Sequence, residues 1–179
     1  MNSSPASLMV LVGKDFACIK IAGRANFNAS INFKTVLTEL RQKGFTYFVI
    51  ELSTCLLMDS TFLGVLAGFG LKMSLPANGS PPQLVELRNP NARITELLET
   101  LGVLHLFNIS RGPLATPETL EVCSPEPAHP SRAEITRACL EAHQTLMEIH
   151  PDNVARFKEV TKFLAEDLQK LQDKPERAT

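Results

Sequence analysis

Near its start the sequence has no long hydrophobic run and no basic segment of the kind that precedes a signal peptide. The first apolar run, Leu8 to Val12, is far too short for a signal peptide or a membrane span. The chain has 179 residues, of which 44% are hydrophobic, so it can still bury one substantial core. We therefore expect a soluble, cytoplasmic protein with one domain and an extension, and no membrane insertion.

A clustered excess of charge is missing as well. The chain has 18 basic and 19 acidic residues, which gives a formal net charge of -1. A nucleic-acid surface needs clustered basic residues, so the composition argues against DNA and RNA as partners.

The sequence also lacks the usual patterns of metal, nucleotide and thiol sites. The four cysteines form no CxxC pair, and His143 and His150, seven residues apart, have no acidic or thiol partner that completes a metal site. The segment "GVLAGFG" falls inside a predicted helix rather than in a phosphate-binding turn. Cys55 ends a buried strand, where a cysteine is usually inert. We expect no metal, no cofactor and no catalysis.

What the sequence does contain is a regular alternation of strand and helix patterns. "LMVLV" and "FACIKIAG" predict a hairpin, and a helix from 28 to 43 follows, with Asn28 or Ser30 as its cap and Gly44 after its end. Three more strands are predicted at "FTYFVIELS", "QLVELRN" and "VLHLFNI", with helices between them that begin near Asp59 and Asn91. This order predicts an α/β fold with a mixed, mostly parallel β-sheet and helices packed against it.

The composition changes after Gly112, the last glycine. Five prolines lie between 113 and 130, which is typical of a semi-rigid linker, and two helical patterns split by Pro151 follow. We predict a domain at 1–110, a proline-rich linker at 111–130 and a helical extension at 131–179. An apolar stripe runs from Val154 to Leu171, so the two helices could pack on the domain or on themselves, or form a homodimer or docking element.

The run Asp59-Ser60-Thr61 lies where a buried strand passes into a helix. Unpaired N–H groups and the helix dipole favour an oxygen acceptor there, so we predict that Asp59 or Ser60 is the N-cap of the helix. The same helix end would tolerate a phosphate on Ser60. Farther along the helix, an apolar face typical of a protein core is formed by Phe62, Leu66, Phe69 and Met73. Gly64 and Gly68 lie roughly opposite this face, and at these glycines either a partner or a neighbouring element could approach closely.

"MDSTFLGVL", after a buried strand in this order of elements, resembles the signature of STAS domains, the fold of bacterial anti-sigma-factor antagonists, whose usual motif is close to M-D-S-S-G-L-G. "IAGRANFNAS" and "NPNARITELLETLGVLHLFNI" are similar to the family as well, and the resemblance covers roughly residues 6 to 110. It implies a STAS fold and a non-enzymatic regulator of transcription that acts by partner switching.

The resemblance also implies a site. Ser60 matches the serine that a cognate kinase phosphorylates in the family. The implied partners are an anti-sigma factor of the histidine-kinase-like ATPase type, which is the serine kinase, and a phosphatase. Asn26 stands where an Asp is usual, and Phe62 stands where a Gly is usual, so its ring could obstruct a kinase. The partner-binding residues implied are Asn26, Asp59, Ser60, Thr61, Phe62, Gly64 and Gly68. The alternatives are a STAS scaffold or accessory subunit that is not phosphorylated, stressosome-like or associated with lipid transport, and a small-ligand- or nucleotide-binding domain.

Overall fold

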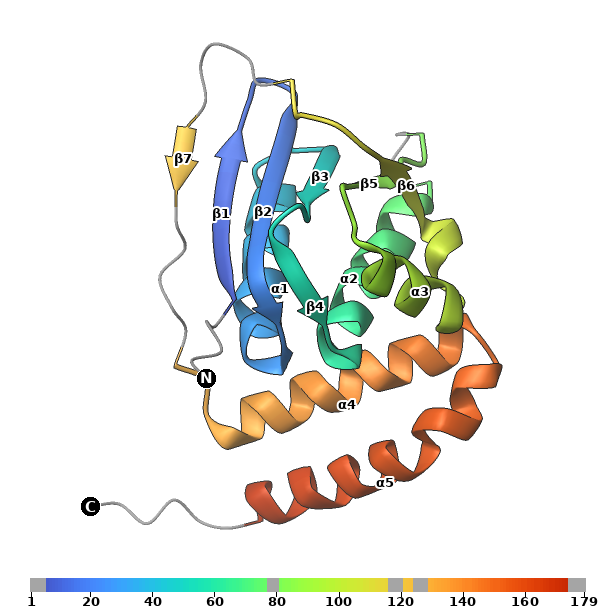
Figure 1. The fold of residues 1–179 in the computed structure, drawn as a ribbon. Coiled ribbons are helices and arrows are strands. Elements are labelled where there is room, and N and C mark those ends of the chain that lie inside the picture. The colour runs from blue at the N-terminus through green and yellow to red at the C-terminus, as the bar shows by residue number, and fades with distance from the viewer. Residues whose placement is uncertain (1–5, 77–80, 116–120, 124–128, 174–179) are drawn as a thin grey trace, which may run out of the picture.

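A computed structural model describes residues 6–76, 81–115, 121–123 and 129–173 of the chain. It contains strands and helices in alternation, followed by two long helices (Figure 1). The strands are β1 (Ser7–Val12), β2 (Phe16–Ala25), β3 (Tyr47–Glu51), β4 (Cys55–Met58), β5 (Val85–Arg88), β6 (Phe107–Ser110) and β7 (Glu121–Cys123). The helices are α1 (Phe27–Gln42), α2 (Ser60–Ser74), α3 (Ala92–Thr100), the short 3-10 helix η1 (Leu104–Leu106), α4 (Arg132–Ile149) and α5 (Asp152–Gln172).

The strands form one sheet in the order β6-β5-β3-β2-β1-β7, and β4 pairs with the far end of β2. β2, β3, β5 and β6 are parallel, whereas β1 is antiparallel to both of its neighbours. The register places Ile50 of β3 between Ile19 and Leu87, all of which are buried. The fold class predicted from the sequence is therefore confirmed: a mixed, mostly parallel sheet with helices packed against it and a C-terminal helical hairpin.

The core lies between the sheet and the two helices α1 and α2. The rings of Phe33 on α1 and Phe62 on α2 stack with their centroids 4.6 Å apart, and Phe48 of β3 meets Phe69 edge-on at 4.9 Å. Leu66 is also fully buried. The predicted apolar face of α2 is thus the core face of that helix, as such stripes usually are.

Three details of the predicted elements are wrong. The strand predicted at "FTYFVIELS" does not run into the Asp59 motif, because it ends at Glu51 and a separate strand, β4, leads there. The segment "VLHLFNI" first makes η1 and only then β6. The cap of α1 is Asn26, whose side chain accepts the N–H of Ala29, rather than Asn28 or Ser30.

The C-terminal helices form a hairpin that lies across one end of the domain, with α4 against α2 and α5 on the outer side of α4 (Figure 1). Leu146 of α4 is fully buried and joins the main core. The stripe predicted on α5 does not form one buried face, because Val154 and Val160 are exposed while Phe157 and Leu164 are half-buried. In the structure α4 packs on the domain and α5 packs on α4, so the tail packs both on the domain and on itself, while a homodimer or docking role stays a prediction.

The predicted linker at 111–130 is described only in part, since residues 116–120 and 124–128 lie outside the described residues. Its described residues include β7, which adds to the sheet beside β1. The boundaries of domain, linker and extension remain a prediction. In the part of the chain that the structure describes, the helices are too short or too polar to cross a membrane.

Candidate functional site

The site is built where β4 passes into α2. Asp59 has an extended backbone and donates its N–H to the carbonyl oxygen of Ala25 at the end of β2, which fixes the turn. Its carboxylate oxygen Oδ1 accepts the N–H of Phe62 at 2.8 Å. Asp59 is therefore the N-cap, and Ser60 is the first residue of the helix.

Asp59 also holds the start of the neighbouring helix. Its second oxygen, Oδ2, accepts the N–H of Phe27 at 2.7 Å, while Asn26 caps α1 through the N–H of Ala29 at 3.3 Å. The structure thus brings Asn26 and Asp59 to two adjoining helix starts. One carboxylate stabilises both helices, because the first N–H groups of a helix have no partner inside it.

The hydroxyl of Ser60 meets a histidine from the C-terminal extension. Its Oγ lies 2.9 Å from Nε2 of His143 on α4, and Nδ1 of the same ring lies 2.6 Å from the carbonyl oxygen of Cys139. A carbonyl oxygen can only accept, so Nδ1 carries a proton, and in the neutral tautomer with this proton Nε2 accepts the hydrogen of the Ser60 hydroxyl. His143 is 7% exposed and its ring also contacts the edge of Phe157 on α5. Ser60 is accordingly half-buried and hydrogen-bonded from across the α2–α4 contact.

Thr61 lies at the same contact and is buried. It interacts with Cys139 on α4, whose thiol has a raised pKa because burial and the charge of Asp59 outweigh the hydrogen bond from Thr61. The raised pKa keeps Cys139 as a neutral thiol, so this residue places no negative charge beside the start of α2.

The two glycines of α2 allow α4 to approach closely. A Cβ atom on Gly64 would lie 2.5 Å from the carbonyl oxygen of Ala142, so the two backbones are in direct contact. A Cβ atom on Gly68 would lie 3.3 Å from the Thr145 side chain, which is a looser fit. Of the two possibilities for these glycines, the structure shows the approach of a neighbouring element.

Phe62 does not lie at the surface of the site. Its side chain is fully buried and its ring stacks on Phe33, on the side of α2 that faces the core. The expectation that this ring contacts a partner or obstructs a kinase is therefore wrong for this arrangement. The site residues that remain together at the start of α2 and along its α4 side are Asn26, Asp59, Ser60, Thr61, Gly64 and Gly68.

An open groove lies beside this contact, between α1, α2 and α4. Its volume is about 600 Å³, and Lys34 of α1 bridges it through a 2.9 Å ion pair with Glu141 of α4. Both side chains are about half exposed, so the pair contributes little to stability. α4 is held closely by α2 and only loosely by α1.

The remaining chemical candidates are remote from this site or blocked. Burial raises the pKa of the Cys55 thiol, which disfavours the thiolate that a nucleophile needs. Burial also raises the pKa of Cys18, to about 11. Within the described ranges, no cluster of three or more His, Cys, Asp or Glu side chains could hold a metal ion.

His143 is the residue of the candidate site that sequence reasoning did not connect to Ser60. It lies 83 positions away on a separate predicted helix, and no spacing rule links the two. Its only sequence signal was its place on an amphipathic helix with no assigned partner.

In comparisons with known proteins, no family model and no curated protein matches the chain. A solved structure, that of the Bacillus cell fate determinant SpoIIAA in the phosphorylated form, is similar with a TM-score of 0.45 and 17% sequence identity. The match covers 59% of this chain and 90% of that chain. Similarity at this level is too low to indicate function.

Proposed function

We propose that this chain is a non-enzymatic regulatory protein of the anti-sigma-factor-antagonist type, controlled by phosphorylation of Ser60. The observation that carries the proposal is the position of Ser60, which is the first residue of α2 directly after the N-cap Asp59. The motif "MDSTFLGVL" therefore occupies the strand-to-helix junction that its resemblance to STAS domains requires.

The chemistry of this position suits a phosphorylation switch. A phosphoserine carries a charge of about -2, which the positive end of a helix stabilises. The same group adds three oxygens next to the carboxylate of Asp59, so it would weaken a protein contact formed there by repulsion and desolvation. One residue can therefore serve as a helix start and as a control point.

The partner in this proposal is an anti-sigma factor of the histidine-kinase-like ATPase type, which would also be the serine kinase. The unmodified protein binds it in the cytoplasm and so frees a sigma factor, and phosphate on Ser60 ends the complex until a phosphatase removes it. The proposed contact surface consists of Asn26, Asp59, Ser60, Thr61, Gly64 and Gly68. We leave Phe62 out because its ring stacks on Phe33 in the core, whereas Thr61 and Gly64 are buried on the side of α2 that α4 covers.

The test is to incubate the protein with a candidate kinase of this type and ATP, and then to map phosphate by tandem mass spectrometry. We expect one phosphate, on Ser60, and none in a Ser60→Ala variant. A Ser74→Ala variant is the matched control, because Ser74 is the hydroxyl at the other end of α2 and lies outside the proposed contact surface. A phosphate on any other residue, or none on Ser60 in all forms of the protein, would remove the phosphorylation switch.

The contact between Ser60 and His143 favours a second candidate, an accessory or scaffold STAS subunit that is not phosphorylated. In this case α4 permanently occupies the α2 surface, and a partner binds elsewhere. A complex purified from the native host that persists unchanged with Ser60→Asp would support it.

A homodimer through the C-terminal helices also remains a prediction. Val160 and Phe163 of α5 are 37% and 66% exposed, and the mass of the particle in solution would test it.

A further inference from the structure

α4 lies on the same side of α2 that the proposed function assigns to a protein partner. The hydroxyl of Ser60 is bonded to His143, and the backbone of Gly64 touches that of Ala142. No side chain of a second protein fits between helices whose backbones are in contact. A kinase cannot align Ser60 for transfer while its hydroxyl is hydrogen-bonded to a buried imidazole.

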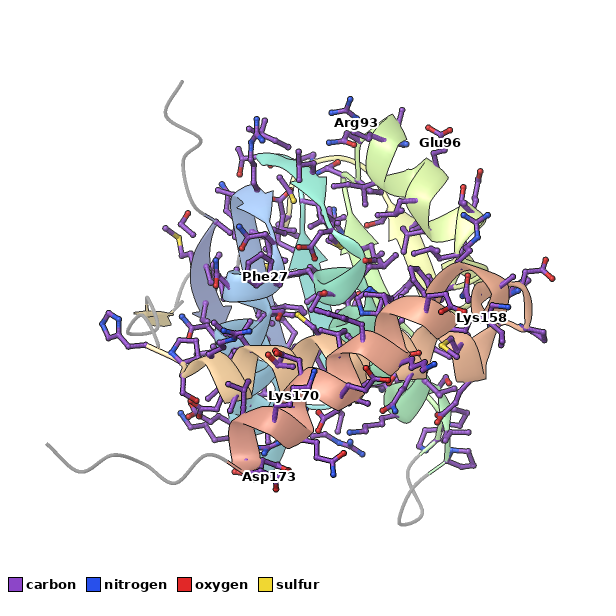
Figure 2. All side chains as sticks on the ribbon, turned by 90° about the horizontal axis from the view of Figure 1, so that it is seen from below. Phe27, Arg93, Glu96, Lys158, Lys170 and Asp173 are labelled. Atoms are coloured by element: carbon purple, nitrogen blue, oxygen red, sulfur yellow. The ribbon has the colours of Figure 1, made fainter. Side chains whose placement is uncertain are left out.

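The two C-terminal helices are tied to each other as one unit. Phe157 of α5 contacts the ring of His143, and Arg132 at the start of α4 pairs with Asp167 of α5 at 3.1 Å. α5 lies outside α4, and Figure 2 shows it nearest the viewer with Lys158 and Lys170 along it. Any movement of α4 away from α2 therefore carries α5 with it.

The attachment of this hairpin to the domain is uneven. Leu146, at the C-terminal end of α4, is fully buried in the core, whereas the ion pair to α1 is half exposed and borders an open groove of about 600 Å³. The part of α4 that faces Ser60 is held by the Ser60–His143 hydrogen bond, by a hydrogen bond between Thr61 and Cys139, and by the close fit at Gly64. Leu140 and Ala142 are buried there as well, so it is the α1 side of α4, along the open groove, that is held loosely. A helix that borders an open groove opens at lower free energy than the core of a domain.

We propose that the α4–α5 hairpin is an intramolecular cover of Ser60, and that α4 must leave α2 before a kinase or a protein partner can reach that serine. This inference rests on the proposed function for its biological meaning, but its test does not. His143 is the residue that holds the cover at Ser60, and Gly64 is the residue that allows it to close.

The experiment uses a cysteine as a probe at the covered position. A Ser60→Cys variant of the full chain is treated with N-ethylmaleimide, and tandem mass spectrometry follows labelling at residue 60 separately from Cys55. The same measurement is made with Gly64→Ala added, because the new Cβ would meet the carbonyl oxygen of Ala142 at 2.5 Å and push α4 away. Alanine also strengthens α2 itself, so the change acts on the contact.

The matched control is Gly68→Ala, the same substitution one turn later, where the new Cβ meets only a side-chain methyl group at 3.3 Å. We expect Gly64→Ala to speed labelling about ten- to a hundredfold, in line with the usual effect of overpacking, and Gly68→Ala to change it by less than about threefold. Equal rates in the two variants, or labelling of the parent variant as fast as that of the unfolded chain, would overturn the cover.

A second measurement needs no probe at residue 60. Backbone hydrogen exchange is compared between α4 and β3 in the unsubstituted chain, in Gly64→Ala and in His143→Ala, which removes the hydrogen bond without adding volume. We expect exchange in α4 to rise about tenfold or more while β3 changes little. If α4 and β3 always accelerate together, α4 opens only when the whole domain unfolds, and the cover is wrong.

The kinase assay separates this inference from the proposed function. Phosphorylation of Ser60 that is faster in Gly64→Ala than in the unsubstituted chain supports both. Fast thiol labelling in Gly64→Ala without phosphorylation of Ser60 in any variant would leave the cover standing and remove the proposed switch.

Discussion

The carboxylate of Asp59 accepts the backbone N–H of Phe27 at 2.7 Å, although the two residues are 32 positions apart and begin different helices. The other oxygen of the same carboxylate caps α2 through Phe62. Asp59 therefore joins the starts of α1 and α2 and holds Ser60 at their junction, so the acid of the motif has a structural role that is independent of any partner.

Replacing Asp59 by Ala should lower the free energy of unfolding by about 2–3 kcal/mol, because one helix cap and one charge-assisted hydrogen bond are lost together. Asp59→Asn should cost less, since a single amide oxygen can keep one of the two bonds. Urea unfolding of the three proteins measures the difference. An Asn variant as stable as the unsubstituted chain would show that the second of the two bonds contributes nothing, and equal stability of the Ala and Asn variants would show that Asn keeps neither bond.

Phe62 should behave as a core residue. Phe62→Ala removes a fully buried ring and its stacking on Phe33, and should cost about 3–5 kcal/mol of folding free energy. Phe62→Gly should cost about 1 kcal/mol more, because glycine weakens the helix. Faster modification of Ser60 in a Phe62→Gly variant would then reflect loosened packing of α2. Loss of less than about 1 kcal/mol in Phe62→Ala would contradict the buried position.

Much of the fold follows from local patterns. The alternation of strand and helix patterns gave the hairpin, the parallel strands and the three helices of the domain, because apolar period and cap residues are short-range signals. The position of Ser60 at a helix start follows from the same signals.

What the sequence could not give depends on contacts between distant residues. Ser30 is not a cap because α1 begins three residues earlier, at Phe27. The N–H of Phe27 is accepted there by the carboxylate of Asp59, which belongs to a different part of the chain. Phe62 could be assigned to either a contact surface or the core until the Phe33 ring was placed beside it. The hydrogen bond between Ser60 and His143 depends on how a separate helical hairpin packs against the domain, and no local pattern specifies this packing.

Tyr47 should titrate above its ordinary range. Its hydroxyl donates to the Glu86 carboxylate, and this hydrogen bond, together with burial and the negative charge, raises the pKa of Tyr47 to about 12. Since this is the sole tyrosine of the chain, the absorbance of tyrosinate reports it directly. A folded-state pKa above the ordinary value of about 10 means that this contribution to stability is present below pH 10 and is lost as the pH rises toward 12.

The pKa of Glu86, the carboxylate partner of Tyr47, is shifted in the opposite direction. Burial would raise the pKa of Glu86, but hydrogen bonds from Ser110, Tyr47 and Arg88 outweigh it, and the pKa is lowered from its ordinary value of 4.5. Its contribution to stability is therefore present above that value and is lost as the pH falls through the lower, folded-state pKa. Glu86→Gln should remove this acid dependence and return the pKa of Tyr47 toward 10. An unchanged tyrosine titration in Glu86→Gln would contradict the hydrogen bond between them.

Asn153 should be the most sensitive polar residue of the C-terminal hairpin. It is fully buried at the turn between α4 and α5, and its side-chain Nδ2 donates to the carbonyl oxygens of Leu101 at 2.9 Å and Leu146 at 2.8 Å. These two carbonyls lie at the end of α3 and in the last turn of α4. The amide group therefore joins the hairpin to the domain at the end remote from Ser60.

Asn153→Ala leaves the carbonyl of Leu101 without this donor, whereas the carbonyl of Leu146 still accepts the N–H of His150, so the change should cost about 1–3 kcal/mol, as for one unsatisfied buried polar group. Asn153→Asp has the same shape but places a carboxylate against two acceptors, so it should cost more than Ala at neutral pH and recover in acid as the carboxylate is protonated. Urea unfolding at two pH values measures both effects. A smaller loss for Asp than for Ala at neutral pH would mean that the buried amide does not make these two bonds, and that the hairpin is held at this end by the apolar contacts of Leu146, Ile149 and Phe157.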